Sequence, residues 1–227
     1  MLTQLVALVV PPCCAACRAP GLPAGEALCP ACRRALPWMP ADTCERCALP
    51  QPHARCPADG AAFSRAWAAM AYEGVARDAI RALKFARARP LADVMAAQIA
   101  ACAPTGLLRE GALVAVPAHP RRRRARGFDP AELLARALAR RTGVAIVPAL
   151  RRDAAAARQL GASRAQRREP GRLRFSARGS VPHRAILVDD VHTTGATLDA
   201  CATALRRAGT QSIVAITWAR TLDKGRH

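Results

Sequence analysis

Aromatic residues, lysine and acidic residues are all scarce in this chain of 227 residues. Phe, Trp and Tyr together make up 4% of the chain, so few side chains are available to stack on nucleobases. Only Lys84 and Lys224 are lysine, and 16 Asp and Glu face 35 Lys and Arg, which leaves a net charge of +19. This excess of positive charge favours phosphate-bearing partners. The alternative is that the arginine- and alanine-rich composition reflects only a biased coding sequence.

Long apolar runs are also missing. No run approaches the ~20 residues that a membrane-spanning helix needs. The run Leu2–Val10 is short, lacks a basic start and ends at two prolines, so we expect no secretory signal. Hydrophobic residues still make up 52% of the chain, enough for a sizeable core. We expect a soluble cytoplasmic protein with no transmembrane segment, in which a small module (1–60) precedes one main domain (61–227).

Eight of the ten cysteines precede residue 57, several of them in C-x-x-C pairs. Two such pairs can place four thiolates on one tetrahedral Zn²⁺, and a module with so few apolar residues needs a metal to fold. The first set of ligands is Cys14, Cys17, Cys29 and Cys32. The second is Cys44, Cys47 and Cys56, with His53 or Asp59 as the fourth. Alternatively, the second set belongs to a degenerate zinc ribbon that binds no metal. We therefore expect one or two structural zinc ions.

The stretch Arg184–Thr197 reads RAILVDDVHTTGAT. Its apolar run Ala185–Val188 predicts a strand buried on both faces, and apolar residues then recur at helical spacing up to Gly209. The polar residues between them lie at the carboxyl end of a strand, where open α/β sheets bind ligands. Hydroxyls and free N–H groups at a helix N-terminus suit a phosphate, and Asp189 and Asp190 suit sugar hydroxyls or Mg²⁺. The alternative is a solvated acidic turn.

Strand-like and helix-like apolar patterns alternate over the rest of the main domain. Strands are expected at 63–72, 112–116, 144–147, 185–188 and 212–218. Helices are expected at 74–85, 90–103, 129–141 and 198–208. This alternation favours an open, mostly parallel α/β sheet flanked by helices, with right-handed crossovers.

Two arginine-rich loops are expected in the main domain. Residues 117–127, PAHPRRRRARG, directly follow a strand, and arginine forks match phosphate oxygens. The alternatives there are a solvated basic turn or a patch for nucleic acid. Residues 149–182 have no sustained period, and a loop of this length is usually functional. It would close over a ligand as a lid, grip a phosphate backbone, or remain a disordered basic loop.

The motif at 185–197 resembles the phosphoribosyl-pyrophosphate (PRPP) motif of type I phosphoribosyltransferases. Nearly the whole chain resembles the ComF family, which joins an N-terminal zinc ribbon to a phosphoribosyltransferase-like domain. The further segments that carry this resemblance are Ala82-Leu83-Lys84-Phe85, Arg126-Gly127-Phe128, Gln159, Ser163-Arg164 and Arg167. Four positions depart from the family pattern: Asp129-Pro130 and Pro170 replace residues that are usually Asn-Gln and Asn, and Asp59 replaces a cysteine.

The resemblance implies a type I phosphoribosyltransferase-like sheet with defined roles for its loops. Asp189 and Asp190 would be the catalytic carboxylates that contact the ribose hydroxyls. The residues that would bind PRPP or its phosphates, with Mg²⁺, are Val191, His192, Thr193, Thr194, Gly195, Ala196 and Thr197, with Pro117, Ala118, Arg121 and Arg126 toward the pyrophosphate. The candidates for a DNA contact or a lid are Lys84, Arg158, Gln159, Arg164 and Arg167.

Two functions follow from the resemblance. The ComF family is associated with the cytoplasmic handling of incoming single-stranded DNA during natural competence. That role implies single-stranded DNA as a partner, together with a competence helicase or another DNA-processing protein. The alternative is an active Mg²⁺-dependent phosphoribosyltransferase that transfers phosphoribose from PRPP to a nitrogen acceptor. No acceptor site or general base is evident in the sequence.

Overall fold

The computed structural model describes residues 13–23, 25–153 and 175–222, and at its centre is a sheet of four parallel strands. In spatial order the strands are β1 (Arg65–Ala71), β6 (Ser212–Arg220), β5 (Arg184–His192) and β2 (Ala112–Ala115). β5 pairs with β6 on one side and with β2 on the other, and both of its faces are covered. This double burial explains its continuous apolar run.

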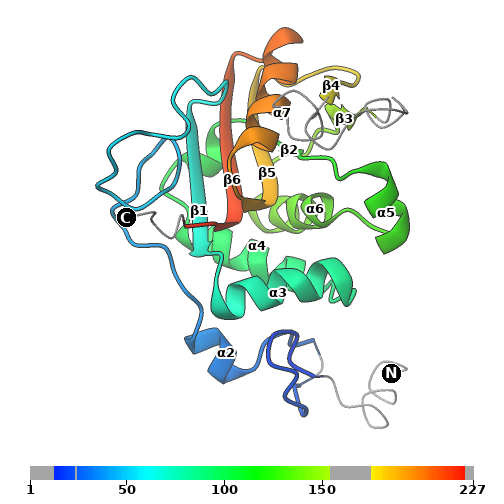
Figure 1. The fold of residues 1–227 in the computed structure, drawn as a ribbon. Coiled ribbons are helices and arrows are strands. Elements are labelled where there is room, and N and C mark those ends of the chain that lie inside the picture. The colour runs from blue at the N-terminus through cyan, green and yellow to red at the C-terminus, as the bar shows by residue number, and fades with distance from the viewer. Residues whose placement is uncertain (1–12, 24, 154–174, 223–227) are drawn as a thin grey trace, which may run out of the picture.

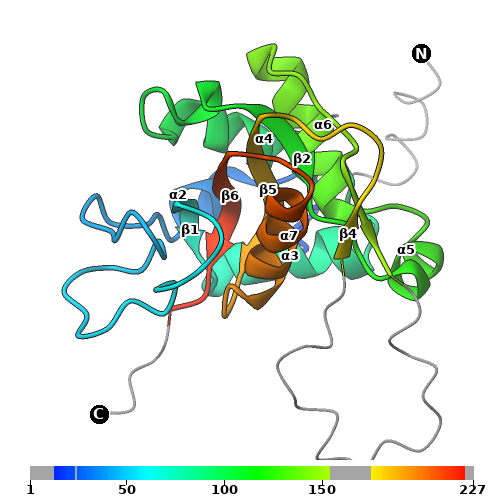
Figure 2. The same cartoon turned by 90° about the horizontal axis from the view of Figure 1, so that it is seen from above.

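Helices cover both faces of the sheet (Figure 1). One face packs against α3 (Gly74–Phe85), α4 (Leu91–Cys102) and α6 (Pro130–Thr142). The other face packs against α7 (Ala196–Arg207). Figure 2 shows α7 on the opposite side of β5 from α4 and α6. Successive residues of β5 serve the two faces in turn: Ile186 and Val188 join the first core and Leu187 the second.

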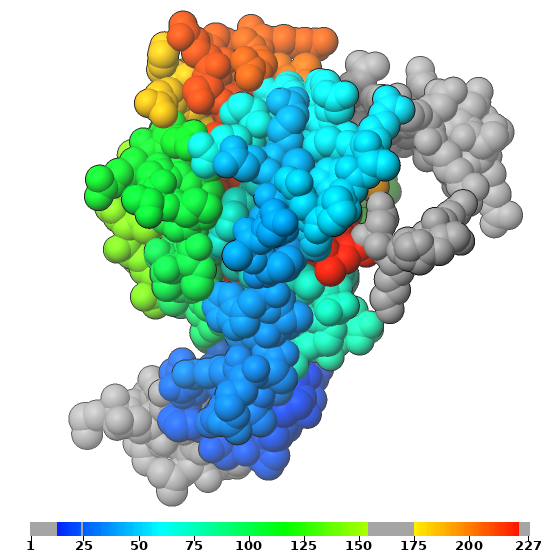
Figure 3. All heavy atoms as spheres, turned by 90° about the vertical axis from the view of Figure 1, so that its left-hand side faces the viewer, coloured from blue at the N-terminus to red at the C-terminus, as the bar shows by residue number. Residues whose placement is uncertain are grey.

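The N-terminal module runs along the outer edge of β1, as the band from blue to cyan in Figure 3 shows. Its contacts with β1 include hydrogen bonds from the N–H of Met39 to the carbonyl of Ala69 and from the N–H of Ala66 to the carbonyl of Glu45. The first cysteine set, next to the short helix α2 (Pro30–Arg34), joins the core under α3. The second joins the core under α7. The two metal-binding sets are therefore attached to opposite faces of the sheet.

Most expected elements are confirmed, with differences near the ligand-binding edge. The expected basic loop at 117–127 contains a helix, α5 (Pro120–Arg126), because Pro120 suits its first position and Gly127 ends it at φ 77°. β5 continues through Asp189 to His192, beyond the predicted end at Val188. The segment expected as a strand at 144–147 makes only an isolated parallel bridge, between Ile146 and Leu113.

The second arginine-rich segment is only partly described. Its ends form a short antiparallel pair, β3 (Leu150–Arg152) with β4 (Phe175–Ala177), which packs beside α7. The lid candidates Arg158, Gln159, Arg164 and Arg167 lie outside the described residues.

A 3₁₀ turn, η1 (Leu107–Arg109), precedes β2. Within the described ranges, no helix has both the length and the apolar character needed to cross a membrane.

Candidate functional site

The two sets of metal ligands are each drawn together in space. The donor atoms of Cys14, Cys17, Cys29 and Cys32 all lie within 4.8 Å of one another, as do those of Cys44, Cys47, His53 and Cys56. A tetrahedral zinc with Zn–S bonds of about 2.3 Å places its sulfurs about 3.8 Å apart. The Sγ atoms of Cys17 and Cys29 are 3.8 Å apart, and those of Cys44 and Cys56 are 3.9 Å apart. Both sets therefore fit a zinc ion.

The fourth ligand of the second set is His53 and not Asp59. The Nε2 atom of His53 lies 3.6 Å from the Sγ atom of Cys47, while its Nδ1 atom lies 3.3 Å from the carbonyl of Pro50. A carbonyl on one ring nitrogen orients the other toward a metal. Asp59 does not belong to the cluster formed by the described residues.

The C-x-x-C segments that begin at Cys14 and Cys44 have the same backbone conformation. The N–H of Arg18 donates to the carbonyl of Cys14, and the N–H of Ala48 donates to that of Cys44. Arg18 and Ala48 also share the left-handed conformation, at φ 66° and 57°. This internal repeat supports metal binding by the second ribbon as well as by the first.

Each set contains a thiol whose pKa is lowered. Burial raises the pKa of Cys14, but hydrogen bonds from backbone N–H groups outweigh burial and lower it to about 6. The same balance lowers the pKa of Cys44 to about 7. Burial instead raises the pKa of Cys47 to about 12. Because thiolates are the ligand form, the lowered pKa values of Cys14 and Cys44 favour metal binding.

The acid pair lies at the carboxyl end of β5, where Lys84 reaches it from the last turn of α3. The Nζ atom of Lys84 is 2.7 Å from Oδ2 of Asp190, and the Asp190 side chain is only 7% exposed. The Asp189 carboxylate accepts a hydrogen bond of 2.8 Å from the N–H of Asp190. Burial first, and then the charge of Asp190, raise the pKa of Asp189 well above its usual range. One lysine thus balances two carboxylates, which leaves the pair suited to a cation or to hydroxyl donors.

The predicted phosphate loop follows the acid pair directly. Thr193, Thr194 and Ala196 are exposed, and Gly195 precedes α7 at φ 85°. A Cβ atom at Gly195 would lie 3.0 Å from Nε2 of His192, so only glycine suits this turn. The predicted ligand His192 has a buried ring that makes an edge contact with Phe63, so a phosphate contact from His192 would have to come from its backbone.

Asp129 holds the predicted phosphate segment 117–127 in place. The buried Asp129 carboxylate accepts a hydrogen bond from the N–H of Ala131, which caps α6, and one of 2.7 Å from the N–H of Ala118. The Ala118 N–H, a predicted phosphate donor, is therefore already engaged. Burial raises the pKa of Asp129 against these hydrogen bonds. Asp129 thus has a structural role at this position.

The arginines of α5 lie beside Phe85, the residue that follows Lys84 in the chain. The Arg126 guanidinium lies 5.1 Å from the centre of the Phe85 ring. Burial, then Arg152 and the arginines of α5, lower the pKa of His119, which reflects the concentration of positive charge here. Arg152 on β3 also interacts with the charge of Asp189. Lys84 and Arg152 therefore bring positive charge to the acid pair from two elements.

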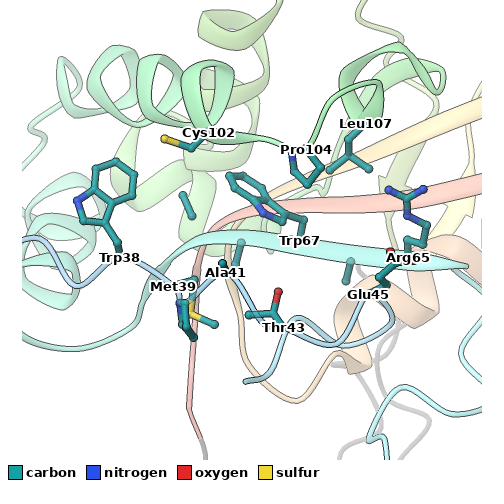
Figure 4. Close-up of a pocket in the computed structure, with 14 residues that line it drawn as sticks. Trp38, Met39, Ala41, Thr43, Glu45, Arg65, Trp67, Cys102, Pro104 and Leu107 are labelled. Atoms are coloured by element: carbon teal, nitrogen blue, oxygen red, sulfur yellow. The ribbon is translucent and has the colours of Figure 1, made fainter. Parts of the chain in front are cut away.

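A separate cavity of about 350 Å³ lies against β1 (Figure 4). It is lined by Trp38 and Trp67, with Cys102 at the end of α4 and Leu107 from the turn that follows. β1 contributes residues 65–69 to its lining, and neither residue of the acid pair lines it. This cavity is therefore distinct from the acid pair at the carboxyl end of β5.

Comparison with known families supports the metal sites. Residues 5–61 match the family described as the double zinc ribbon domain. No curated protein and no solved structure matches the chain. The match and the two ligand clusters together show an N-terminal double zinc ribbon joined to an α/β domain with a mostly parallel sheet.

Several site contacts had no local signal in the sequence. The ion pair between Lys84 and Asp190 joins residues from α3 and β5. Arg220, at the end of β6, is buried and donates to the carbonyl of His192 beside the phosphate loop. An arginine at the end of an apolar strand has no spacing that marks it as part of a site. Only the strand order brings these side chains to one edge.

We predict that the purified protein contains about two zinc ions per chain. His53→Ala should lower this to about one, because the second site loses a ligand. Asp59→Asn is the matched control and should keep both ions, since Asp59 lies outside the cluster. Elemental analysis after dialysis measures the ratio. Loss of zinc from Asp59→Asn but not from His53→Ala would contradict the assignment.

We predict that Lys84→Met destabilises the protein by about 3 kcal/mol, because it leaves the buried Asp190 carboxylate without its cation. Arg136→Met removes the exposed pair with Glu132 and should cost under about 0.5 kcal/mol. Urea unfolding gives both values. Equal effects of the two variants would show that the Lys84 pair contributes nothing specific.

We predict that Asp189→Asn stabilises the protein at neutral pH. The raised pKa means that wild-type stability is greatest with Asp189 protonated and is lost as pH rises through the folded-state pKa. Asparagine does not ionise, so the advantage of the variant should grow from about pH 4 upward. Melting temperatures measured across pH test this. An advantage that shrinks with rising pH would contradict the electrostatic account.

Proposed function

We propose that the chain binds PRPP, or a related phosphoribose ligand, at Asp189–Thr197 through a type I phosphoribosyltransferase-like domain. The observation that carries this proposal is the order of groups after β5: two carboxylates, an exposed threonine turn with Gly195 at φ 85°, and the N-terminus of α7. Carboxylates accept hydrogen bonds from ribose hydroxyls, and a helix N-terminus binds a phosphate. The position at the carboxyl edge of a parallel sheet supports a ligand site.

The pyrophosphate would lie toward Pro117–Arg126. Arg121 and Arg126 on α5 present guanidinium groups, and the contact between Arg126 and Phe85 connects this helix to the neighbour of Lys84. Mg²⁺ bound with PRPP would neutralise phosphate charge, with Asp189 and Asp190 as carboxylates suited to approach it. The cations around the acid pair would then face the anionic part of the ligand.

We further propose that the protein acts in the cytoplasmic handling of incoming single-stranded DNA during natural competence, with a helicase or another DNA-processing protein as its partner. The supporting surface is Phe85, whose side chain is 74% exposed, together with Arg126 and the exposed arginines of α5. Bases stack on exposed aromatic rings while arginines bind the phosphate backbone. Phe63 is unavailable for stacking because it is buried.

A second candidate function is transfer of phosphoribose from PRPP to a nitrogen acceptor. The observation that supports it is the position of the acid pair at the carboxyl end of β5 beside the exposed threonine turn, where a carboxylate could take a proton from an acceptor N–H. In this reaction the acceptor nitrogen forms a bond to the anomeric carbon while the bond to pyrophosphate breaks. Release of pyrophosphate from PRPP, tested with a panel of nitrogenous bases, would distinguish an enzyme from a binding protein.

We predict Mg²⁺-dependent binding of PRPP, measured by titration calorimetry on the zinc-loaded protein. Asp189→Asn should weaken binding by about tenfold to a hundredfold, because a charge-assisted hydrogen bond to the ribose is lost. This variant is informative because we expect it to be stably folded. Asp93→Asn, an exposed position paired with Arg140, is the charge-matched control and should bind as the wild type does. Absence of heat from the wild type at millimolar PRPP would contradict the proposal.

We predict that single-stranded DNA binds with a steep dependence on salt and that Phe85→Ala weakens it by about tenfold, the loss expected for one stacked base. The slope of affinity against salt should not change, because no charge is removed. Trp38→Ala, at the other large exposed aromatic side chain, is the control. Fluorescence anisotropy over a salt series gives both quantities. Equal losses in the two variants would remove Phe85 from the interface.

A further inference from the structure

One buried guanidinium connects the second zinc ribbon to the predicted phosphate loop. Arg220, the last residue of β6, is 3% exposed. Its Nε atom donates to the carbonyl of Cys47 at 2.8 Å, and its Nη1 atom donates to the carbonyl of His192 at 3.1 Å and to that of Thr193. Cys47 is a ligand of the second metal set. The same side chain therefore holds the backbone of a metal ligand and the start of the phosphate loop.

Two further contacts fix Ala62, just after the second ribbon, to the first and last turns of α7. The Asp199 carboxylate accepts the N–H of Ala62 at 2.7 Å, and Arg206 donates to the carbonyl of Ala62. Phe63 makes its edge contact with the ring of His192, with the ring centres 6.3 Å apart. A cavity of about 220 Å³ remains between the segment 57–61 and the loop 194–196. The second ribbon thus forms one wall behind the phosphate loop.

The hydrogen bonds from Arg220 to the loop carbonyls affect how the loop can bind a phosphate. In a planar trans peptide the C=O and N–H groups point in opposite directions. Because the carbonyl of Thr193 faces Arg220, the N–H of Thr194 is turned away from Arg220. Thr193 and Thr194 are both exposed. Arg220 therefore orients a backbone donor toward the side from which a phosphate approaches.

The first ribbon has no comparable connection. Its residues Cys14, Leu28 and Cys32 share a core with Ile80 and Leu83 of α3, on the opposite face of the sheet from α7. Among the described residues, no hydrogen bond joins residues 13–36 to the loop 192–197. The two ribbons therefore provide a matched pair, one attached to the phosphate loop and the other remote from it.

We propose that Arg220 is a positioning residue that couples metal occupancy of the second ribbon to the phosphate loop. A bound metal fixes Cys47, Cys47 fixes Arg220, and Arg220 fixes the carbonyls that orient the loop. Loss of that metal alone weakens phosphoribose binding, and the ligand in turn slows loss of that metal, because coupling between two binding sites is reciprocal. This proposal rests on the proposed function for its ligand, but its structural part can be measured without one.

The first measurement is hydrogen exchange of the peptide that spans 192–199 in the full chain without ligand. His53→Ala, which disables the second metal site, and Arg220→Met should both speed exchange in this peptide. Arg220→Lys should restore part of the protection, since a lysine can still donate to a carbonyl. Cys17→Ser, which disables the first metal site, should leave this peptide as in the wild type. Unchanged exchange in both His53→Ala and Arg220→Met, or an equal change in Cys17→Ser, would overturn the proposal.

The second measurement uses PRPP with Mg²⁺ as the probe. PRPP should slow the release of one of the two zinc ions to a chromogenic chelator by about tenfold in the wild type, and this effect should vanish in Arg220→Met, whose metal ligands are intact. PRPP that binds but slows both ions equally, or neither, would overturn the coupling. If the variants show the expected pattern of hydrogen exchange but the wild type gives no heat with PRPP, the proposed function fails while the structural coupling stands.

Discussion

The arrangement of the main domain depends on two adjacent carboxylates at the end of its central strand. Asp190 is nearly buried and its partner Asp189 has a raised pKa, so the pair is costly to hold in the folded protein. Lys84 offsets part of this cost from α3, and its position requires the packing of α3 beside the carboxyl edge of β5. Stability alone does not require such a pair, and residues held at a cost are typical of ligand sites.

The zinc ribbons extend this organisation to the N-terminal module. The two ligand sets follow one backbone design, yet they are attached to opposite faces of the sheet. The first packs on the helix that supplies Lys84, and the second reaches the phosphate loop through Arg220. Both ribbons therefore support elements of the candidate site. The module is too small to fold on apolar burial alone, so bound metal would make it rigid. The elements that pack against it are then held in place by a rigid neighbour.

Local patterns were sufficient to predict most strands and helices of the main domain, the parallel sheet and the cysteine ligands of both metal sets. They failed where local rules left a choice. The run of arginines in α5 was expected as a loop, although Pro120 and Gly127 bound it as helix ends do. Spacing alone leaves His53 and Asp59 as alternatives for the fourth ligand, and the fold decides between them. The contact of Arg220 with Cys47 spans 173 positions, so no local pattern contains it.

The most direct test of the central claim is the location of PRPP in crystals of the zinc-loaded protein grown with Mg²⁺. The account predicts the 5′-phosphate on the backbone of Thr193–Thr197, the ribose hydroxyls on Asp189 and Asp190, and the pyrophosphate toward α5. A phosphate held only by the arginines of α5, with the acid pair still facing Lys84 alone, would contradict a phosphoribose site and would indicate a general anion-binding surface.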